Sequence, residues 1–556
     1  MKKVLSLVLA LLMVVSMMAV IASAADPAPA PTNPEKYAEL LKNASVYSGT
    51  PDYSWYVDIA KTKAATAALA ADATPALVKV ASADKTYTIK TADQFWGFME
   101  ISNGMAVIDG VTYPAYNTFK GETIKLDADV VINVGDADAW WKATEYSSAN
   151  GVDTMTKVEG LHMWTPISQS HAMLKVDNAD PADGDQYYHK NIKTSCFFEG
   201  TFDGQGHAIS GIYSLRGRQN GLFGQVTNGH VKNFKLVNSV FYNYGNKHSN
   251  NNATPGIEKN NQGASQGAGL VERLDGAGTV SGIYTDAYFR GGWCTGGIVA
   301  YLQGTNTVVE DCVFDGVVDG STGKSGFSCG LIIGGDDNEN QHYVKNCVAS
   351  GTLILGRDLM SWQTNPDTSA TAKGCGLVIG NLKKTAISDV TVTGVALIGE
   401  GRSDADFSLI GWDNNKGGTL KNVLVVSEQA YPANANTAIT DEIAGKNYVD
   451  VTVVTTAEYI AMAQAAADKA AADAAAAKAA ADKALADEKA AAAEAAKKAA
   501  DELAAVKADL EAAKAEAPAA DDKAEEGCKG VIAAGAILVT VSALGLGAVV
   551  AKKKED

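Results

Sequence analysis

Side chains that mark several common functional classes are scarce in this chain of 556 residues. Aromatic residues make up 7% and charged residues 20%, which is low for an enzyme of this length. The formal net charge is −17, and the sequence has no cluster of Lys and Arg of the kind that releases counterions from nucleic-acid phosphates. The 7 cysteines form no CxxC pair and the 7 histidines form no HExxH pair. Nucleic acid is therefore not an expected partner, and zinc catalysis is not predicted.

Glycine and apolar residues, in contrast, are abundant. The 54 glycines follow no Gly-X-Y period, which excludes collagen and favours a β architecture with many turns. Hydrophobic residues make up 46%, too many for a disordered, highly charged chain. The length allows two to four domains.

The two ends of the chain carry targeting signals. Residues 1–24 have a basic start, an apolar middle and a small-x-small end, which predicts a cleaved signal peptide, with an uncleaved anchor as the alternative. Residues 531–551 are apolar and uncharged, and as a helix they would span roughly 31 Å, close to the thickness of a bilayer core. Residues 552–556 begin with three lysines, as a cytoplasmic tail does. Together these signals predict a single-pass protein of the cell surface, with its N-terminal domain outside. Cys528 is either an ordinary juxtamembrane thiol or a processing or lipid-attachment site beside this span.

A long helix is expected before this span. Residues 456–516 consist mostly of Ala with Lys, Asp and Glu, which are strong helix formers. We interpret this segment as a stalk, and residues 517–530 as an acidic spacer. The spacing of Leu503, Val506 and Leu510 suits a narrow coiled-coil seam, so a coiled-coil dimer and a linker without a partner helix both remain open.

The middle of the chain repeats a two-part unit of strands. A glycine followed by apolar residues recurs, as in Gly221–Gly224 and Gly376–Gly380, and a longer alternating strand follows each time. Alternation with a period of two indicates strands that bury one face. Constant strands with loops of variable length indicate a solenoid. We therefore predict an all-β, right-handed parallel β-helix over residues 84–455, preceded by an N-terminal segment, 25–83, with an Ala-rich insertion.

Three segments resemble the GLUG-motif family of bacterial surface proteins: Phe198–Ile212, Asn220–Gly224 and Gly229–Phe234. The resemblance implies an extracellular β-helix with an adhesin-like or carbohydrate-facing role, and it implies no catalytic site. The long insertions at 134–195 and 243–265 depart from the family pattern, and we expect ligand specificity to lie there. Thr91 and Gln94 predict the capped start of a short helix.

Candidate ligand-binding residues are aromatic and acidic side chains in expected loops. Tryptophans can stack on sugar rings, and acidic turns can bind sugar hydroxyls or Ca²⁺. The candidates are Trp140, Trp141, Trp362, Trp412, Asp336, Asp337 and Asp413. A hydrophobic cover for the tryptophans and solvated turns for the acids are the alternatives.

Four cysteines fall in two columns of the repeat. Cys312 and Cys347 share an inward-facing column with Phe234, and Cys329 and Cys375 each precede a Gly-Leu step. Stacked turns would bring each pair within reach of a disulfide, but buried thiols that act as small apolar side chains are the favoured interpretation.

These features predict a membrane-anchored, adhesin-like binding protein with no cofactor except, as an option, Ca²⁺. Its partner would be an extracellular glycan, cell-wall or host polymer, or protein. The alternatives are a polysaccharide lyase or hydrolase on the same scaffold, and a structural envelope protein.

Overall fold

The structure is a computed structural model. It describes residues 36–38, 41–70, 72–149, 152–169, 174–175, 187–188, 196–216, 220–243, 267–291, 294–320, 328–337, 340–354, 375–398, 408–413, 417–426 and 448–515. The predicted signal peptide, acidic spacer, membrane span and basic tail, together with Cys528 and Trp362, lie outside these residues. The chain divides into two units, Met1–Asp468 and Lys469–Asp556.

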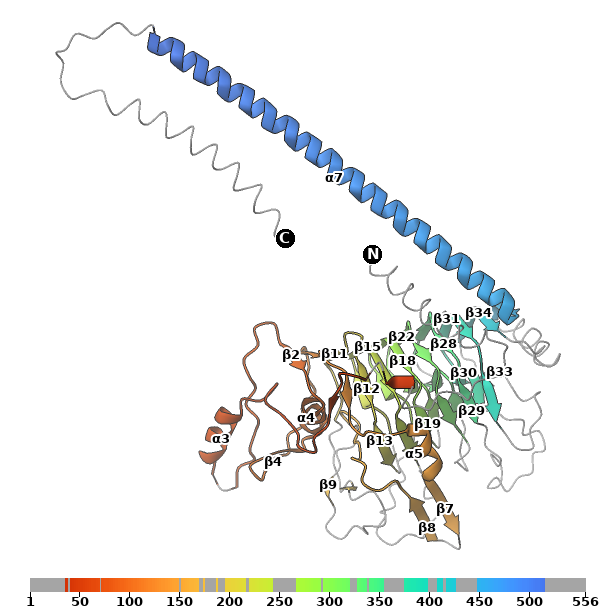
Figure 1. The fold of residues 1–556 in the computed structure, drawn as a ribbon. Helices are drawn as coiled ribbons and strands as arrows, with labels where there is room; N and C mark the ends of the chain where they lie inside the picture. Colours follow the sequence, from red (N-terminus) through yellow and green to blue (C-terminus); the bar gives the residue numbers. More distant parts are fainter. Residues whose placement is uncertain are drawn as a thin grey trace. The chain divides into compact units, whose positions relative to one another are not determined.

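Three parallel sheets form the first unit (Figure 1). The first sheet has 15 strands: β1 (Ser45–Val46), β2 (Thr86–Ile89), β5 (Thr123–Leu126), β6 (Val130–Val131), β11 (Thr201–Asp203), β12 (Ala208–Ser210), β15 (His230–Val237), β18 (Thr279–Thr285), β22 (Val308–Glu310), β23 (Val313–Phe314), β27 (His342–Lys345), β28 (Val348–Ala349), β31 (Thr385–Val392), β34 (Thr419–Val426) and β35 (Tyr448–Val454). The second sheet has six: β13 (Tyr213–Arg216), β16 (Val240–Asn243), β19 (Tyr288–Arg290), β24 (Val317–Asp319), β29 (Thr352–Ile354) and β32 (Ala396–Ile398). The third sheet has eight: β14 (Phe223–Thr227), β17 (Val271–Asp275), β20 (Cys294–Gly296), β21 (Val299–Leu302), β25 (Ser328–Gly330), β26 (Ile333–Asp336), β30 (Cys375–Leu382) and β33 (Ser408–Asp413).

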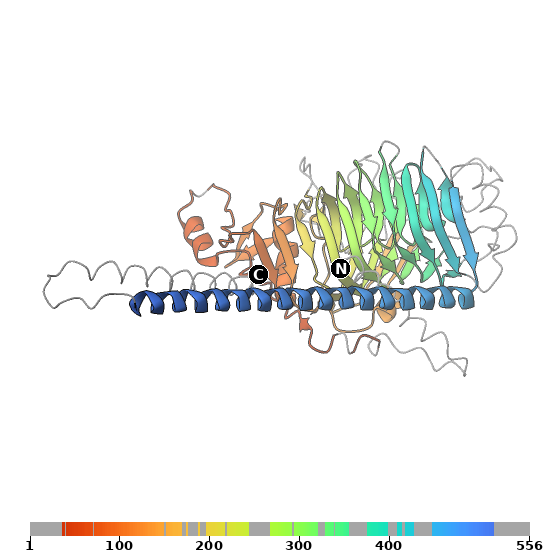
Figure 2. The ribbon, with the colours of Figure 1, turned by 90° about the horizontal axis from the view of Figure 1, so that it is seen from above.

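The chain visits the three sheets in a fixed order. It runs from β15 in the first sheet to β16 in the second and β17 in the third, and then returns to the first sheet as β18, which pairs in parallel with β15. Later turns repeat this path, so the strands follow one another in chain order along the unit, from yellow through green to blue (Figure 2). This arrangement confirms the prediction of a parallel β-solenoid head.

Apolar columns in register fill the interior between the sheets. One column of paired residues in the first sheet comprises Val231, Val280, Val309, Val344, Ile387 and Leu420. All six are buried, with at most 1% of each residue exposed. Burial of apolar side chains stabilises by about 25 cal/mol per Å², so stacking such columns turn upon turn supplies the main stabilisation of the head.

The described part of the first unit also contains short helices and antiparallel hairpins. The helices are α3 (Ile59–Ala67), α4 (Ala92–Asn103) and α5 (Ala137–Ala143), and the antiparallel hairpins pair β3 (Ala106–Ile108) with β4 (Val111–Tyr113), β7 (Glu145–Ala149) with β8 (Val152–Thr156), and β9 (Leu174–Lys175) with β10 (Tyr187–Tyr188). As predicted, the Thr91 side chain caps α4 by accepting a hydrogen bond from the Gln94 backbone N–H at 3.2 Å. Helix α4 then buries Phe95 and Phe98, and the Phe98 ring stacks on Phe202 at 5.8 Å between centroids.

One long helix, α7 (Thr456–Ala515), follows the last strand. It contains 60 residues, so it is about 90 Å long. Thr455 and Glu458 form a capping box at its start: the Thr455 hydroxyl accepts from the Glu458 N–H at 3.2 Å, and the Glu458 carboxylate accepts from the Thr455 N–H at 2.8 Å. The predicted Ala-rich helix is therefore present. Leu485, Val506 and Leu510 are each more than half exposed, and a coiled coil stays a prediction.

The predicted single-pass localisation requires correction. Within the part of the chain that the structure describes, no helix is both long and apolar enough to cross a membrane. This finding contradicts the assignment of a single-pass protein. Residues 531–551, which carried that assignment, lie outside the described ranges.

Candidate functional site

The predicted tryptophans take different positions. Trp140 on α5 is only 6% exposed, and its ring packs edge-on against Tyr213. Trp141, the next residue, is half-buried. Trp412 lies in β33 opposite Asn381, and its side chain is outside the description, as is the whole of Trp362. Trp140 thus belongs to the hydrophobic cover, while Trp141 keeps an accessible surface.

Two of the predicted acidic residues, Asp336 and Asp337, form hydrogen bonds within the turns of the head. Asp336 is fully buried, and its carboxylate accepts hydrogen bonds from the backbone N–H groups of Lys383, Lys384 and Thr385 and from the Thr385 hydroxyl, at 2.7 to 2.9 Å. These donors occupy both oxygens, so the ligand-binding role predicted for Asp336 is replaced by a structural one. Asp337 accepts from the Gly304 and Asn340 N–H groups, each at 3.2 Å. Asp413 ends β33, and its side chain lies outside the description.

The cysteines stack as the repeat predicts. Cys312 and Cys347 each precede a residue of the paired strands β23 and β28, and both are buried in the core. Cys329 in β25 pairs directly with Cys375 in β30. Among the described residues, Cys196, Cys294, Cys312 and Cys347 are free thiols. For Cys312 and Cys347 this agrees with the favoured interpretation of buried thiols over disulfides, whereas the side chain of Cys375 lies outside the description.

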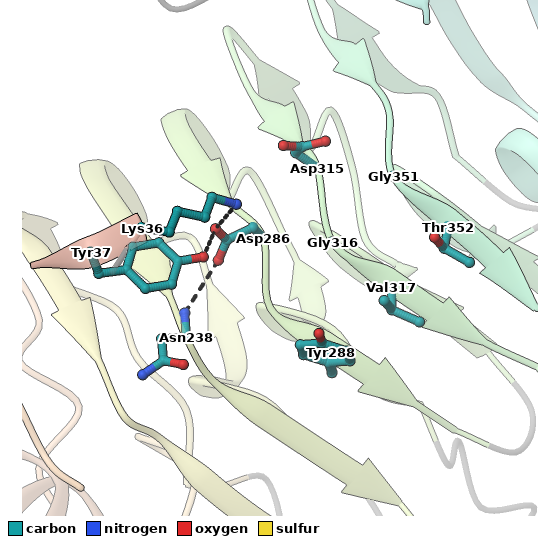
Figure 3. A pocket seen from close by; sticks show the side chains of 10 residues that line it. All are labelled: Lys36, Tyr37, Asn238, Asp286, Tyr288, Asp315, Gly316, Val317, Gly351 and Thr352. Atoms are coloured by element: carbon teal, nitrogen blue, oxygen red, sulfur yellow. Dashed lines mark hydrogen bonds and ion pairs between the residues drawn. The ribbon is translucent and has the colours of Figure 1, made fainter. Parts of the chain in front are cut away.

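Two aspartates, neither of them predicted as site residues, share a pocket at the corner between the first and second sheets (Figure 3). Asp286 follows β18 and Asp315 follows β23, and they occupy equivalent positions on adjacent turns because Thr285 pairs with Phe314. Gly316 forms part of the tight corner, since a β-carbon there would lie 2.1 Å from the Ala287 carbonyl oxygen. We call this the corner pocket; it is lined by Lys36, Tyr37, Asn238, Asp286, Tyr288, Asp315, Gly316, Val317, Gly351 and Thr352.

Asp286 is the most enclosed charge of the corner pocket, with 3% of its side chain exposed. The ammonium of Lys36 lies 3.0 Å from its carboxylate, and the Tyr37 hydroxyl donates to the same oxygen. The Asn238 backbone N–H donates to the other oxygen at 3.2 Å. In Figure 3, Lys36 and Tyr37 both point toward Asp286 from an N-terminal segment about 250 residues away in sequence. The carboxylate is therefore both neutralised and hydrogen-bonded, as a buried charge requires.

Asp315 forms weaker polar interactions than Asp286 does. The Ser350 hydroxyl donates to it at 3.0 Å, and the Tyr284 hydroxyl lies 3.5 Å from one oxygen of Asp315 and of Asp286 alike. Burial raises the pKa of Asp315, and the charge of Lys36 opposes that rise. Burial, strengthened by the Asp286 carboxylate, also raises the pKa of Tyr37 and of Tyr284, so both phenols stay protonated and act as donors at neutral pH.

An aromatic cluster adjoins the corner pocket. Trp141 packs over Tyr242 and Tyr288, with ring centroids 5.8 and 5.4 Å away, and the Arg290 guanidinium lies 4.6 Å from the centroid of the Tyr242 ring. Tyr288 also lines the corner pocket and donates its hydroxyl to Asp138 at 3.1 Å. We call Trp141, Tyr242 and Tyr288 the aromatic cluster. Tyr288 is thus shared by the cluster and the corner pocket, whereas Tyr242 is fully buried.

Local sequence explains how α5 reaches this place. The Asp136 side chain caps the helix by accepting from the Asp138 N–H, and the Asn238 side chain accepts from the Ala137 N–H at 2.9 Å. Asn238 also donates to the Gly135 carbonyl at 2.9 Å, which fixes the entry of the chain into α5. The helix is thereby held against the second sheet by a residue that itself lines the corner pocket.

The size of the corner pocket limits what it can hold. Its volume is about 140 Å³, whereas pockets for drug-sized ligands measure roughly 300–1,000 Å³. It therefore suits a single ammonium or hydroxyl group with some water. Over the described ranges, no group of three or more His, Cys, Asp or Glu side chains is placed to hold a metal ion.

Sequence reasoning missed four residues of this pocket: Lys36, Tyr37, Asp286 and Asp315. The two aspartates had a detectable signal, because each follows the same strand of consecutive repeats. The sequence carried no such signal for Lys36 and Tyr37, because these residues precede the repeats. No protein-family model, curated protein or solved structure matches this chain.

Proposed function

We propose that this protein is an adhesin-like binding protein whose ligand is a glycan, and that its head is a right-handed parallel β-helix of the GLUG-motif type. The observation that carries the proposal is the aromatic cluster beside the corner pocket. Trp141 offers an amphipathic ring, and the adjoining Asp286, Asp315 and Thr352 offer polar groups. Sugars present apolar ring faces and hydroxyl edges, and this combination of side chains matches both.

The insertion that carries α5 also supports this assignment. Within the described head, α5 adds Trp141 to a sheet face that already holds Tyr242 and Tyr288. Asp138 and Arg290 border the rings, so the cluster has charged hydrogen-bonding groups at its rim. A rigid scaffold with binding groups on an insertion is a common way to build specificity.

The experiment is a depletion assay with the full chain. The protein is mixed with insoluble mucin, plant polysaccharides or peptidoglycan, and the protein left in solution is measured. Trp141→Ala is expected to weaken binding about tenfold, since truncation of an aromatic hot spot costs about 1.4 kcal/mol or more. Tyr343→Ala is the control, because Tyr343 is 40% exposed on the first sheet, away from the aromatic cluster. Absence of depletion by every polymer, or equal binding by both variants, would contradict the proposal.

A second candidate, polysaccharide hydrolysis, has one observation in its favour. Both Asp286 and Asp315 have an oxygen 3.5 Å from the Tyr284 hydroxyl, so these oxygens are at most twice that distance apart. Glycosidases use carboxylate pairs about 5–9.5 Å apart. A reducing-end assay on the same polymers tests this candidate. Release of sugar ends by the unmodified protein, lost in Asp315→Asn, would establish an enzyme.

A further inference from the structure

The corner pocket holds a cation that the chain supplies from a distance. Lys36 reaches Asp286 across 250 residues of sequence, and 41% of the lysine side chain remains exposed to solvent. Asp286, in contrast, is 3% exposed. One partner of this ion pair is therefore fixed in the head, and the other is a surface residue of the N-terminal segment.

A positive charge is required at this point. A carboxylate enclosed to this degree is strongly destabilising when no opposite charge accompanies it. The phenols of Tyr37 and Tyr284 and the Asn238 N–H donate hydrogen bonds to Asp286 but carry no charge. Among the described residues that line the pocket, Lys36 is the cationic one. The pocket is thus complementary to an ammonium group in particular.

The pocket has room beside Lys36. A volume of about 140 Å³ remains with Lys36 in place, and its far side is formed by Asp315, Gly316, Gly351 and Thr352 on the following turns. The two glycines present no side chain there. Asp315 thus offers a second carboxylate to any group that enters.

We propose that the corner pocket is an ammonium-binding subsite that Lys36 fills from within the chain, and that the ligand which displaces Lys36 is a glycan with a free primary amine, such as a de-N-acetylated hexosamine. This inference rests on the proposed glycan-binding function. The sugar ring stacks on the aromatic cluster, and its ammonium group takes the place of the Lys36 ammonium between Asp286 and Asp315. An N-acetylated sugar carries no charge and leaves Lys36 in position.

The experiment compares two soluble probes on the full chain by calorimetry at a pH where the amine is protonated: a glucosamine oligomer and the N-acetylglucosamine oligomer of equal length. The unmodified protein is expected to prefer the amine. Lys36→Met removes the competing ammonium and should strengthen binding of the amine about tenfold while leaving the acetylated probe unchanged. Lys63→Met is the matched control, since Lys63 is a half-exposed lysine paired with Asp109 outside the pocket. Asp286→Asn should abolish the preference for the amine.

Folding effects are separated by a second measurement. Loss of Lys36 leaves Asp286 uncompensated, so Lys36→Met should unfold at a lower temperature, and the glucosamine oligomer should raise that temperature more than it does for the unmodified protein. Lys63→Met should show neither effect.

The outcomes distinguish this inference from the glycan-binding proposal. Equal binding of both probes by the unmodified protein and by Lys36→Met, with dependence on Trp141, would overturn the ammonium subsite and leave glycan binding intact. Failure of both probes to bind any of these proteins would overturn both. Stronger displacement by a Lys-Tyr peptide amide than by the glucosamine oligomer would also overturn the inference, because it would assign the pocket to peptide.

Discussion

Removal of the Asp336 carboxylate should lower the free energy of unfolding of the head, whether or not any ligand is present. The carboxylate is buried, and it accepts hydrogen bonds from three backbone N–H groups, those of Lys383, Lys384 and Thr385, at 2.8 to 2.9 Å. Asp336→Ala leaves these donors without a partner inside the turn that joins β30 to β31. A buried donor left unsatisfied costs about 1–3 kcal/mol. The Thr385 N–H is buried and those of Lys383 and Lys384 are only partly buried, so the three together should lower the free energy of unfolding by about 3–6 kcal/mol, less than three full penalties.

The measurement is urea unfolding of the full chain followed by tryptophan fluorescence, which reports on the head because α7 contains no tryptophan. Asp84→Ala is the control: its exposed carboxylate accepts from the Thr86 N–H at 3.1 Å, and water can replace it, so the change should cost about 1 kcal/mol or less. A ligand role for Asp336 predicts the opposite pattern, with unchanged stability and lost binding. Unfolding of Asp336→Ala within 1 kcal/mol of the unmodified protein would refute the assignment as a turn cap.

Three further changes test the packing and the charges of the head. Asn346→Asp should lose about 1–2 kcal/mol of stability, less at high salt, because it replaces a hydrogen bond to Asp311 on the adjacent turn with a like-charge pair; urea midpoints at low and high salt measure this. Gly297→Ala should prevent folding or cost several kcal/mol, since a β-carbon there would lie 2.1 Å from a buried ring, whereas Gly335→Ala meets nothing closer than 3.4 Å and should be tolerated in the same thermal scan. Burial raises the pKa of Asp315, so its contribution to stability is present below the ordinary pKa of Asp and is lost as pH rises through the raised value. Asp315→Asn should therefore gain stability relative to the unmodified protein as pH rises through this window. A parallel pH dependence of the free energy of unfolding in the two proteins would contradict this sign.

The periodic part of the structure was predictable from the sequence because a solenoid repeats its local rules. An alternating strand identifies its own buried face, and the next repeat places an equivalent residue above it. The inward-facing column that begins with Phe234 and Ile283 was predicted correctly for this reason, and so was the burial of Cys312 and Cys347 in it. The capped start of α4 at Thr91 and the Ala-rich α7 are equally local features, set by a cap and by helix propensity.

The candidate site was not predictable in the same way, because it depends on contacts between distant segments. Lys36 lies beside Asp286 although they are 250 residues apart in the sequence, so only the path of the N-terminal segment in the folded chain brings them together. Trp140 and Trp141 are adjacent on α5, and only the position of that helix on the second sheet decides that Trp140 is enclosed and Trp141 is accessible. Asp336 resembles a solvated turn acid in sequence, but the backbone of β31 on the next turn encloses it.

The position of the site follows from a change along one column of the second sheet. Residues paired across β13, β16, β19, β24 and β29 form the outward column Tyr213, Val240, Tyr288, Val317 and Thr352. Helix α5 and its neighbours cover the first three members, whereas Val317 and Thr352 line the corner pocket. The covered members therefore include two tyrosines, whereas the members that line the corner pocket, Val317 and Thr352, have short side chains. A glycan of the proposed kind must therefore span this boundary, with a ring on the half-buried Trp141 and a charged group at Asp286.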